Sequence, residues 1–367
     1  MTDITRSIPT YQRALVATQG KTWQLRLDMT IPRLKDDEVL ININAVALNP
    51  SDVKSVQHAA IEDTIGGCDM AGTVAMLGKD VGAKLTVGDR VSAFVFGGSM
   101  ARPDNGAFAE YAVAKADFCI RLPSATTFTE AASWNTGLVT CGLAFRSLGL
   151  VDDFGEAIKA ASTLTNTTRV PILVYGGSTA TGTIALQLLR DLGFETITTC
   201  SPHNFALVQK AGAQRAFDYA QATSGHDIWE FCAGKLQYVI DCIGDDASTS
   251  LCYRAVGPKG GRYVSLNPFP RRLALRRRDI SVDWVLGYSV FGDRVQLTTE
   301  YQKAAAPEDV VFAGRWTTKM EELVQKGIVV AHPIEVRDGG LASIIEDAEM
   351  LRAGKVSGKK LVYAVGR

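Results

Sequence analysis

The sequence has no long apolar run, no excess charge of either sign and few histidines. None of its apolar stretches approaches the roughly eighteen residues that cross a bilayer, and the opening MTDITRSIPT lacks the apolar core of a signal peptide. The 39 Lys and Arg residues balance 39 Asp and Glu residues, whereas a general nucleic-acid-binding protein carries a basic excess. We therefore expect a cytoplasmic protein that binds neither membranes nor nucleic acid.

The cysteines and histidines also lack the spacing typical of metal ligands. The chain of 367 residues holds seven cysteines and four histidines, and no two cysteines form a C-x-x-C pair. Reduced, mostly buried thiols are the default for such cysteines in a reducing compartment. We expect neither a disulfide framework nor a metal site.

A glycine-rich segment does stand out, and it indicates a nucleotide site. Residues 174–182 read VYGGSTATG, between an apolar strand and an amphipathic helix over 184–192. This arrangement aims a helix N-terminus at a pyrophosphate. Gly176 and Gly182 match the outer glycines of the dinucleotide fingerprint, while Thr179 takes the place of the middle one. An ordinary turn between strand and helix is the alternative.

The end of the next strand, predicted over 196–200, indicates which nucleotide is bound. The residues that follow it are Ser201, Pro202, His203 and Asn204, with no acid among them. An Asp or Glu there would hold a ribose 2′-hydroxyl, whereas a hydroxyl, an imidazole and an amide can surround a 2′-phosphate. We interpret the site as one for NADPH; a surface histidine in a turn is the alternative for His203.

The periodicity along the chain predicts an α/β protein of two domains. Residues 12–120 alternate as short strands with glycine turns, which is typical of a small β-barrel. Further apolar strands at 237–242 and 262–266 alternate with helical stretches, as in a doubly wound parallel sheet. The remaining predicted elements are helices over 128–136 and 139–148, a polar surface loop over 151–169 and a strand over 358–365.

The order of these pieces resembles the medium-chain dehydrogenase/reductase superfamily. The landmarks that carry the resemblance are Asn49–Asp52, Gly67–Gly72, Val87–Val91, Gly106–Tyr111 and the terminal GKKLVYAV. The resemblance implies a GroES-like β-barrel catalytic domain, a doubly wound Rossmann domain that binds the nucleotide, and a C-terminal return to the catalytic domain. We expect these parts to span 1–135, 136–315 and 316–367.

The chain departs from the zinc alcohol dehydrogenases of this superfamily. Their Gly-His-Glu metal element falls at Gly67-Cys68-Asp69, where the histidine is missing, and their four-cysteine lobe has no counterpart between Val91 and Ala114. Without a Lewis acid, the chemistry expected is reduction of an activated C=C, in which the substrate's own carbonyl accepts charge as an enolate.

Within the zinc-free branch, the chain resembles the trans-acting enoyl reductases of fungal polyketide assembly, the lovastatin type. The shared strings YGGSTAT, TCSPHN, FDY, YVSLNPFP and DW-x-LG stand at 175–181, 199–204, 217–219, 263–270 and 283–287. The resemblance implies NADPH-dependent reduction of an enoyl thioester held on the carrier domain of a separate polyketide synthase or synthase–peptide synthetase. It favours a monomer over a homodimer. A free-standing quinone or enone reductase is the alternative function, and a non-enzymatic NADPH-binding protein is a third.

The resemblance also implies the site residues. Those for the cofactor are Asn49, Pro50, Ser51, Asp52, Ser178, Thr179, Ala180, Thr181, Ser201, Pro202, His203, Asn204, Tyr219, Leu266, Asn267, Val356 and Ser357. Those for the substrate are Asn135, Thr136, Gly137, Leu138, Val139, Thr140, Cys141, Gly142, Leu286, Gly287, Tyr288, Ser289 and Val290. For Tyr219, which follows a strand, packing is the alternative.

Lys54 and Thr140 are the expected catalytic residues. A solvated loop lysine and a helix-interior threonine bonded to its own backbone are their respective alternatives. Related enoyl reductases carry a proton-donating tyrosine soon after the Asn-Pro-x-Asp element, but residues 57–61 contain none. Water, Lys54 and His58 are therefore the open choices for the proton donor.

The sharpest charge feature is RRLALRRR at 271–278. Such a run is ordinarily a solvated face. Because carrier domains are commonly acidic, a basic rim could also steer their docking.

Overall fold

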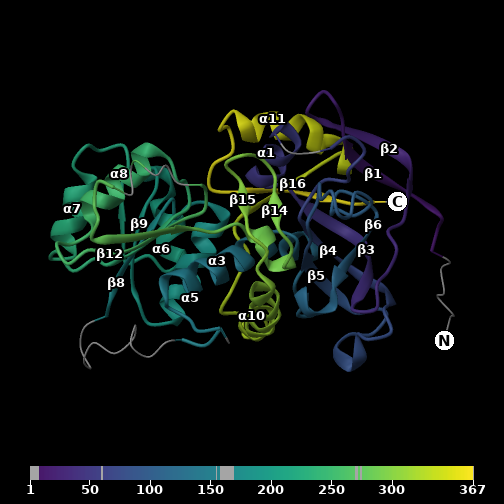
Figure 1. Ribbon diagram of the computed structural model, residues 1–367, viewed down its shortest axis with the longest axis horizontal. Coiled ribbons are helices and arrows are strands. Elements are labelled where there is room, and N and C mark those ends of the chain that lie inside the picture. Colours follow the sequence, from purple (N-terminus) through teal and green to yellow (C-terminus); the bar gives the residue numbers. More distant parts are fainter. Residues whose placement is uncertain are drawn as a thin grey trace. The chain divides into compact units, whose positions relative to one another are not determined.

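The computed structural model describes residues 8–58, 61–153, 155–157, 169–268, 272 and 275–366. These residues form two compact units (Figure 1). The first unit takes the described chain up to Asn135 together with Ile334–Val356 and the residues from Lys360 onward, and the second takes Thr136–Pro333 and Ser357–Lys359. The polar segment of 151–169 lies largely outside the described residues. No helix of the described chain has the length and apolar character needed to cross a membrane.

The first unit is built on an antiparallel sheet. Its strand order is β16-β17-β3-β4-β5-β7, with β6 paired to the first half of β3 and a separate β1–β2 pair. The strands are β1 (Tyr11–Ala17), β2 (Trp23–Thr30), β3 (Glu38–Ala47), β4 (Asp69–Leu77), β5 (Arg90–Phe94), β6 (Tyr111–Lys115), β7 (Cys119–Arg121), β16 (Ile334–Arg337) and β17 (Lys360–Ala364). The helical elements are α1 (Pro50–His58), α2 (Phe128–Ala131) and α11 (Ile344–Arg352), with 3₁₀ turns η1 (Gly82–Lys84), η2 (Ala116–Phe118) and η5 (Gly340–Ser343).

The C-terminal strand β17 lies in this sheet beside β3. β17 pairs antiparallel with β3, placing Val362 opposite Ala47, and β16 pairs parallel with β17. Buried side chains of β3, β4 and β17 form one apolar core, in which Phe108 packs edge-on against Trp23 with ring centroids 5.4 Å apart. The C-terminal strand is thus an integral part of the barrel unit.

The second unit contains a parallel sheet of six strands among the described residues, in the order β10-β9-β8-β11-β12-β13. The strands are β8 (Pro171–Tyr175), β9 (Glu195–Thr199), β10 (Arg215–Phe217), β11 (Tyr238–Asp241), β12 (Gly261–Ser265) and β13 (Ile280–Trp284), with a small hairpin of β14 (Val295–Gln296) and β15 (Gln302–Lys303). Its helical elements are α3 (Asn135–Leu148), α5 (Ala180–Asp191), α6 (Phe205–Ala211), α7 (Ser224–Phe231), α8 (Asp246–Ala255) and α10 (Pro307–Gln325), with 3₁₀ turns η3 (Pro202–Asn204) and η4 (Gly287–Phe291).

The strand order of this sheet locates a binding crevice. All five residues of β8 are buried, as expected for a strand with helices on both faces of its sheet. The chain leaves β8 in one direction for β9 and β10, and later returns to the other side of β8 for β11, β12 and β13. Ligands of such sheets bind beyond the carboxyl ends of the strands where the order reverses, here between β8 and β11. The apolar strand expected before the glycine-rich segment and the predicted strands at 196–200, 237–242 and 262–266 are confirmed as β8, β9, β11 and β12.

Helix α10 joins the second unit through Trp316. The indole Nε1 of Trp316 donates to the carbonyl of Leu138 at 2.8 Å, and its ring packs against Phe145 and Phe312. Residues 316–333, placed in the C-terminal return by the sequence, therefore cluster with the second unit, because α10 runs through position 316 without a break.

Candidate functional site

The loop between β8 and α5 needs glycine for steric reasons. Gly176 has φ +80°, and the N–H groups of Gly176 and Gly177 donate to the Thr199 carbonyl at 3.1 and 3.0 Å. A Cβ on Gly182 would lie 2.4 Å from the Gly176 carbonyl oxygen, and a Cβ on Gly177 would lie 1.9 Å from Thr198 Oγ1. The loop is therefore pressed against the end of β9, as a dinucleotide-binding turn requires.

Helix α5 begins at Ala180 and is capped by Thr179. The Thr179 hydroxyl accepts from the Gly182 N–H at 2.9 Å, a standard N-cap bond. Ser178, Thr179, Ala180 and Thr181 are all half-buried at this end of the helix. The first-turn N–H groups of a twelve-residue helix and its dipole make this end a place for an anion.

The residues after β9 form a polar cluster with Tyr219 and Ser357 of the same unit. His203 Nε2 lies 3.2 Å from Ser357 Oγ, and Asn204 Nδ2 donates to Ser357 Oγ at 3.1 Å. Ser201 Oγ lies 3.2 Å from the Tyr219 hydroxyl. Five of the predicted cofactor residues are thus brought together, with Pro202 beside them in η3.

The acid beside this cluster, Asp218, is hydrogen-bonded within its own turn. Asp218 accepts from the N–H of Ala220 at 2.9 Å and from the side chain of Gln221 at 3.4 Å, so its carboxylate closes its own turn. Hydroxyl, imidazole and amide groups therefore face one another where an acid would select a ribose hydroxyl.

Asp241, at the end of β11, organises the other side of the crevice and was missed in the sequence. One carboxylate oxygen accepts from the N–H groups of Ile243 and Gly244, both at 2.9 Å, and the other accepts from the Tyr263 hydroxyl at 2.8 Å. Burial raises the pKa of Asp241 above its usual range. The acid near the end of the otherwise mostly apolar string QYVIDC is the signal that could have found it.

Asn267 braces the loop after β12. Its side-chain amide donates to the Ile243 carbonyl at 2.5 Å and accepts from the Tyr301 hydroxyl at 2.8 Å. Leu266, beside it, is half-buried. The two loops beyond β11 and β12 are therefore tied to each other through Asn267.

Part of helix α3, predicted to contact substrate, packs on neighbouring helices. A Cβ on Gly137 would lie 2.6 Å from Ile184 Cδ1 of α5, and a Cβ on Gly142 would lie 2.6 Å from Trp316 Nε1 of α10. Cys141 Sγ donates to the Thr181 carbonyl at 3.7 Å, and Thr140 is 9% exposed. The other predicted members of this helix are Asn135, Thr136, Leu138 and Val139.

The predicted substrate segment 286–290 forms the turn η4 and the residue before it. Tyr288, Ser289 and Val290 are buried, and Leu286 and Gly287 are half-buried. The Ser289 hydroxyl donates to the carboxylate of Asp309. This bond anchors the turn to α10.

In the first unit, a polar network holds the Asn49-Pro50-Ser51-Asp52 turn. Asp52 Oδ2 accepts from the backbone N–H of Asn49 at 2.8 Å and from its amide at 3.3 Å. The Asn49 amide also donates to Asp69 at 3.0 Å. Lys360, which the sequence did not single out, donates to the same Asp69 oxygen at 2.5 Å. Burial raises the pKa of Asp52 to about 6.

Lys54 and Val356 occupy different settings in this unit. Lys54 is an exposed residue of α1, and desolvation lowers the pKa of its ammonium from the usual value. His58, also exposed, ends the same helix. Val356 is half-buried against the barrel core.

The residues at the zinc-ligand position do not fit a metal. The Asp69 carboxylate is held by the Lys360 ammonium and by the Asn49 amide, so a second cation would have to displace the first. Within the ranges that the structure describes, no group of three His, Cys, Asp or Glu side chains converges to ligate an ion.

A barrel unit joined to a Rossmann unit defines a medium-chain dehydrogenase/reductase, which binds NAD(P). Residues 35–124 match the alcohol dehydrogenase GroES-like domain, and residues 180–303 match the zinc-binding dehydrogenase domain. The chain is 40% identical to trans-enoyl reductase buaC of Petromyces alliaceus, over 98% of this chain and 99% of that protein. It is 41% identical to trans-enoyl reductase opdC of Penicillium oxalicum, over 98% of both chains. The chain therefore belongs to the trans-enoyl reductases.

Solved structures agree on the fold. The CurK enoyl reductase superposes with a TM-score of 0.71 at 17% identity, covering 96% of this chain and 99% of that one. The quinone oxidoreductase from Coxiella burnetii superposes with a TM-score of 0.69 at 22% identity, covering 97% of this chain and 100% of that one. At such identities the likeness concerns the architecture alone, and it confirms the predicted fold class.

Proposed function

We propose that this chain is an NADPH-dependent enoyl reductase that acts in trans. Its substrate is an α,β-unsaturated thioester on the carrier domain of a separate polyketide synthase or synthase–peptide synthetase. The observation that carries the proposal is the identity of about 40% with trans-enoyl reductases over the whole length of the chain. That the protein works as a cytoplasmic monomer remains a prediction.

The choice of NADPH rests on the polar cluster after β9. His203, Asn204 and Ser357 are mutually within 3.3 Å, and Ser201 and Tyr219 add two hydroxyls. These groups can donate to a 2′-phosphate, and the first turn of α5 offers its N–H groups to the pyrophosphate. Changing His203→Ala should weaken NADPH by roughly tenfold to a hundredfold, the value of hydrogen bonds to a charged group, and leave NADH unchanged.

The reaction adds a hydride to the β-carbon and a proton to the α-carbon. When bound, the nucleotide supplies the hydride, and the thioester carbonyl takes up the developing charge as an enolate. Because the residues around Asp69 do not fit a metal, hydrogen-bond donors must stabilise that oxygen. Lys54 is the predicted hydrogen-bond donor in the first unit, and desolvation lowers the pKa of its ammonium. Water, Lys54 and His58 are still the open choices for the proton donor.

NADPH oxidation by the purified protein tests the proposal. We expect oxidation with an α-methyl enoyl pantetheine thioester, much slower oxidation with a simple quinone, and little activity with NADH. Turnover of the quinone alone would transfer the chain to the free-standing quinone reductases, and NADPH binding without turnover of either would indicate a non-enzymatic role.

A further inference from the structure

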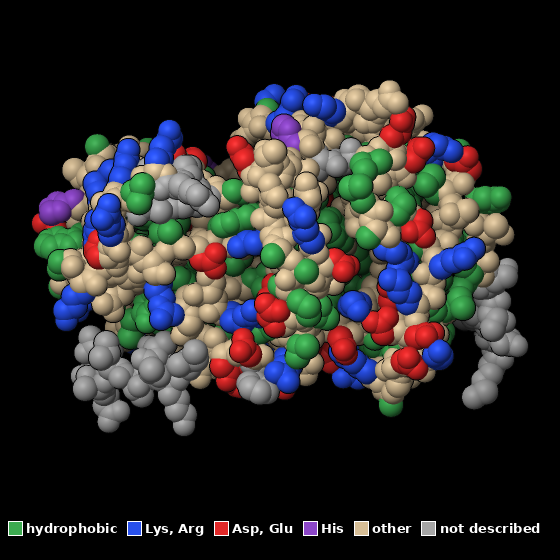
Figure 2. Space-filling model, viewed as in Figure 1, with side chains coloured by type: hydrophobic (Ala, Val, Ile, Leu, Met, Phe, Trp, Pro, Cys, Tyr) green, Lys and Arg blue, Asp and Glu red, His purple; other side chains and the backbone are tan. Residues whose placement is uncertain are grey.

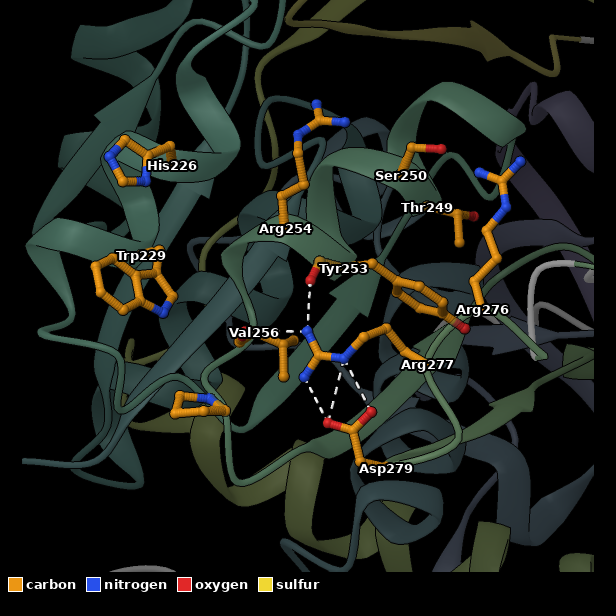
Figure 3. A pocket seen from close by; sticks show the side chains of 11 residues that line it. His226, Trp229, Thr249, Ser250, Tyr253, Arg254, Val256, Arg276, Arg277 and Asp279 are labelled. Carbon is orange, nitrogen blue, oxygen red and sulfur yellow. Dashed lines mark hydrogen bonds and ion pairs between the residues drawn. The ribbon is translucent and has the colours of Figure 1, made fainter.

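A basic groove lies along α8, away from the nucleotide loops. It has a volume of about 820 Å³ and is lined by His226, Trp229, Thr249, Ser250, Tyr253, Arg254, Val256, Pro258, Arg276, Arg277 and Asp279 (Figure 3). Figure 2 shows Lys and Arg side chains gathered over the α7–α8 end of the unit. Arg254 lies nine residues beyond the helix cap Asp245, or about 14 Å at 1.5 Å per residue. The groove therefore runs along α8 from its first turns, at Thr249 and Ser250, to its C-terminal end at Arg254.

The arginines of the run 271–278 have different roles. Arg277 donates to the carbonyls of Tyr253, Val256 and Gly257 and pairs with Asp279 at 2.5 Å. These carbonyls end α8, so Arg277 caps the helix C-terminus. Arg272 pairs with Asp246.

Two arginines of the groove are left without a carboxylate among the residues that the structure describes. Arg254 and Arg276 are both exposed, and in Figure 3 they extend away from the ion pair of Arg277 and Asp279. Glu230 of α7, which does not line the groove, lies 3.2 Å from His226. Arg254 and Arg276 therefore give the groove a positive charge that no carboxylate lining it pairs within the described residues.

The groove also presents an aromatic surface. Trp229 is 37% exposed and stacks on the His226 ring, with centroids 5.8 Å apart. The hydroxyls of Thr249 and Ser250 are used within α8, where they donate to the carbonyls of Asp245 and Asp246. Cations at the rim and an apolar floor suit a protein surface rather than a small anion, which would need free polar groups inside the groove.

We propose that this groove docks an acidic helix of the partner synthase's carrier domain. The inference rests on the proposed function, since it names where that partner binds. Carboxylates of the helix pair with Arg254 and Arg276, and an apolar residue of the helix packs on Trp229. Such rim charges mainly accelerate association and make it depend on salt. The docked carrier lies beside the enzyme's nucleotide-binding unit while its flexible arm delivers the thioester.

Removing the two unbalanced charges tests the proposal. The double variant Arg254→Ser/Arg276→Ser is compared with Arg278→Ser, a matched control that removes an exposed arginine of the same run outside the groove. We expect kcat/KM for an enoyl chain on a holo-carrier domain to fall on the order of tenfold or more at low salt, mainly through KM. The control variant should match wild type, and the pantetheine thioester should be reduced normally by all three proteins. Wild type should also lose carrier-bound turnover with rising salt more steeply than the double variant.

Each outcome bears on a separate claim. If wild type reduces neither thioester, the proposed function fails. If wild type reduces both and the double variant keeps its kcat/KM for the carrier-bound chain, the groove is not the docking site and the function stands. Equal loss on both substrates would also overturn the docking role. Trp229→Ala supplies a second variant, expected to raise KM for the carrier-bound chain alone.

Discussion

Lys360 and Asp69 form a buried ion pair that connects the C-terminal strand to β4. The Nζ–Oδ2 distance is 2.5 Å, and the side chains are 5% and 0% exposed. Lys360 also donates to the Ser133 carbonyl at 3.1 Å, and Asp69 accepts from Asn49. The pair thereby supports the Asn49–Asp52 turn from the far end of the sequence.

Breaking this pair should be costly. Lys360→Met leaves the Asp69 carboxylate buried without its cation, and we expect a loss of about 3 to 5 kcal/mol in the free energy of unfolding. Urea denaturation measures it, with the exposed Lys355→Met as the control. The double variant Lys360→Met/Asp69→Leu should recover part of the lost free energy of unfolding, because neither charge of the pair is then left buried without its partner. A single variant as stable as the control would show that the pair does not support the barrel.

Asp52 should make stability depend on pH in a predictable direction. Its pKa is raised to about 6 by burial, so the folded state binds more protons than the unfolded state between about pH 4 and pH 6. Stability therefore falls as pH rises through this window. Relative to Asp52→Asn, wild type should lose about 1.4 kcal/mol between pH 5 and pH 7.5. Urea denaturation of both proteins at the two pH values gives the difference, and parallel pH profiles would refute the assignment.

Gly182 should be indispensable for nucleotide binding. A Cβ at this position would lie 2.4 Å from the Gly176 carbonyl oxygen. This oxygen belongs to the backbone, so it cannot rotate away as a side chain could. We expect Gly182→Ala to raise the Kd for NADPH more than tenfold, measured by fluorescence titration. Gly20→Ala is the control, because its Cβ would meet nothing closer than 3.4 Å. Unchanged affinity in Gly182→Ala would mean that the nucleotide does not use this loop.

Turnover by variants of Lys54 and of His58 distinguishes which of the two residues donates the proton. If Lys54 donates the proton, Lys54→Met should lower kcat by about 10² to 10⁴, and His58→Gln should be nearly silent. Wild-type kcat should fall as pH rises through a pKa below the usual lysine value, because desolvation lowers it. The pH–rate profile and the two variants are measured on the pantetheine thioester. Normal turnover by Lys54→Met would leave His58 or water as the donor.

Local patterns predicted the parallel sheet well. Buried strands of such a sheet are apolar runs followed by small or polar residues, and 172–182 and 196–204 have this form. The polar residues that follow β9 could also be found in the sequence, because most of them are neighbours along the chain. Their role in binding NADPH stays a prediction. His203 and Asn204 are joined there by Ser357, which the family resemblance supplied.

Contacts between residues far apart in the sequence could not be predicted from local patterns. Nothing in the residues around Lys360 indicates that its ammonium bonds to Asp69, 291 positions away. Likewise, Arg277 belongs to a run that suggests a solvated face, yet it caps α8 through backbone carbonyls. Such contacts depend on how elements pack, and the sequence pattern does not encode them locally.

The transfer of an isotope from the nucleotide tests the central claim most directly. The protein is given NADPH that carries deuterium at the transferred position, together with an α-methyl enoyl pantetheine thioester, and the product is analysed by mass spectrometry and NMR. We predict one deuterium on the β-carbon of a saturated thioester. NADPH oxidation with no deuterium in the thioester would contradict enoyl reduction by this chain.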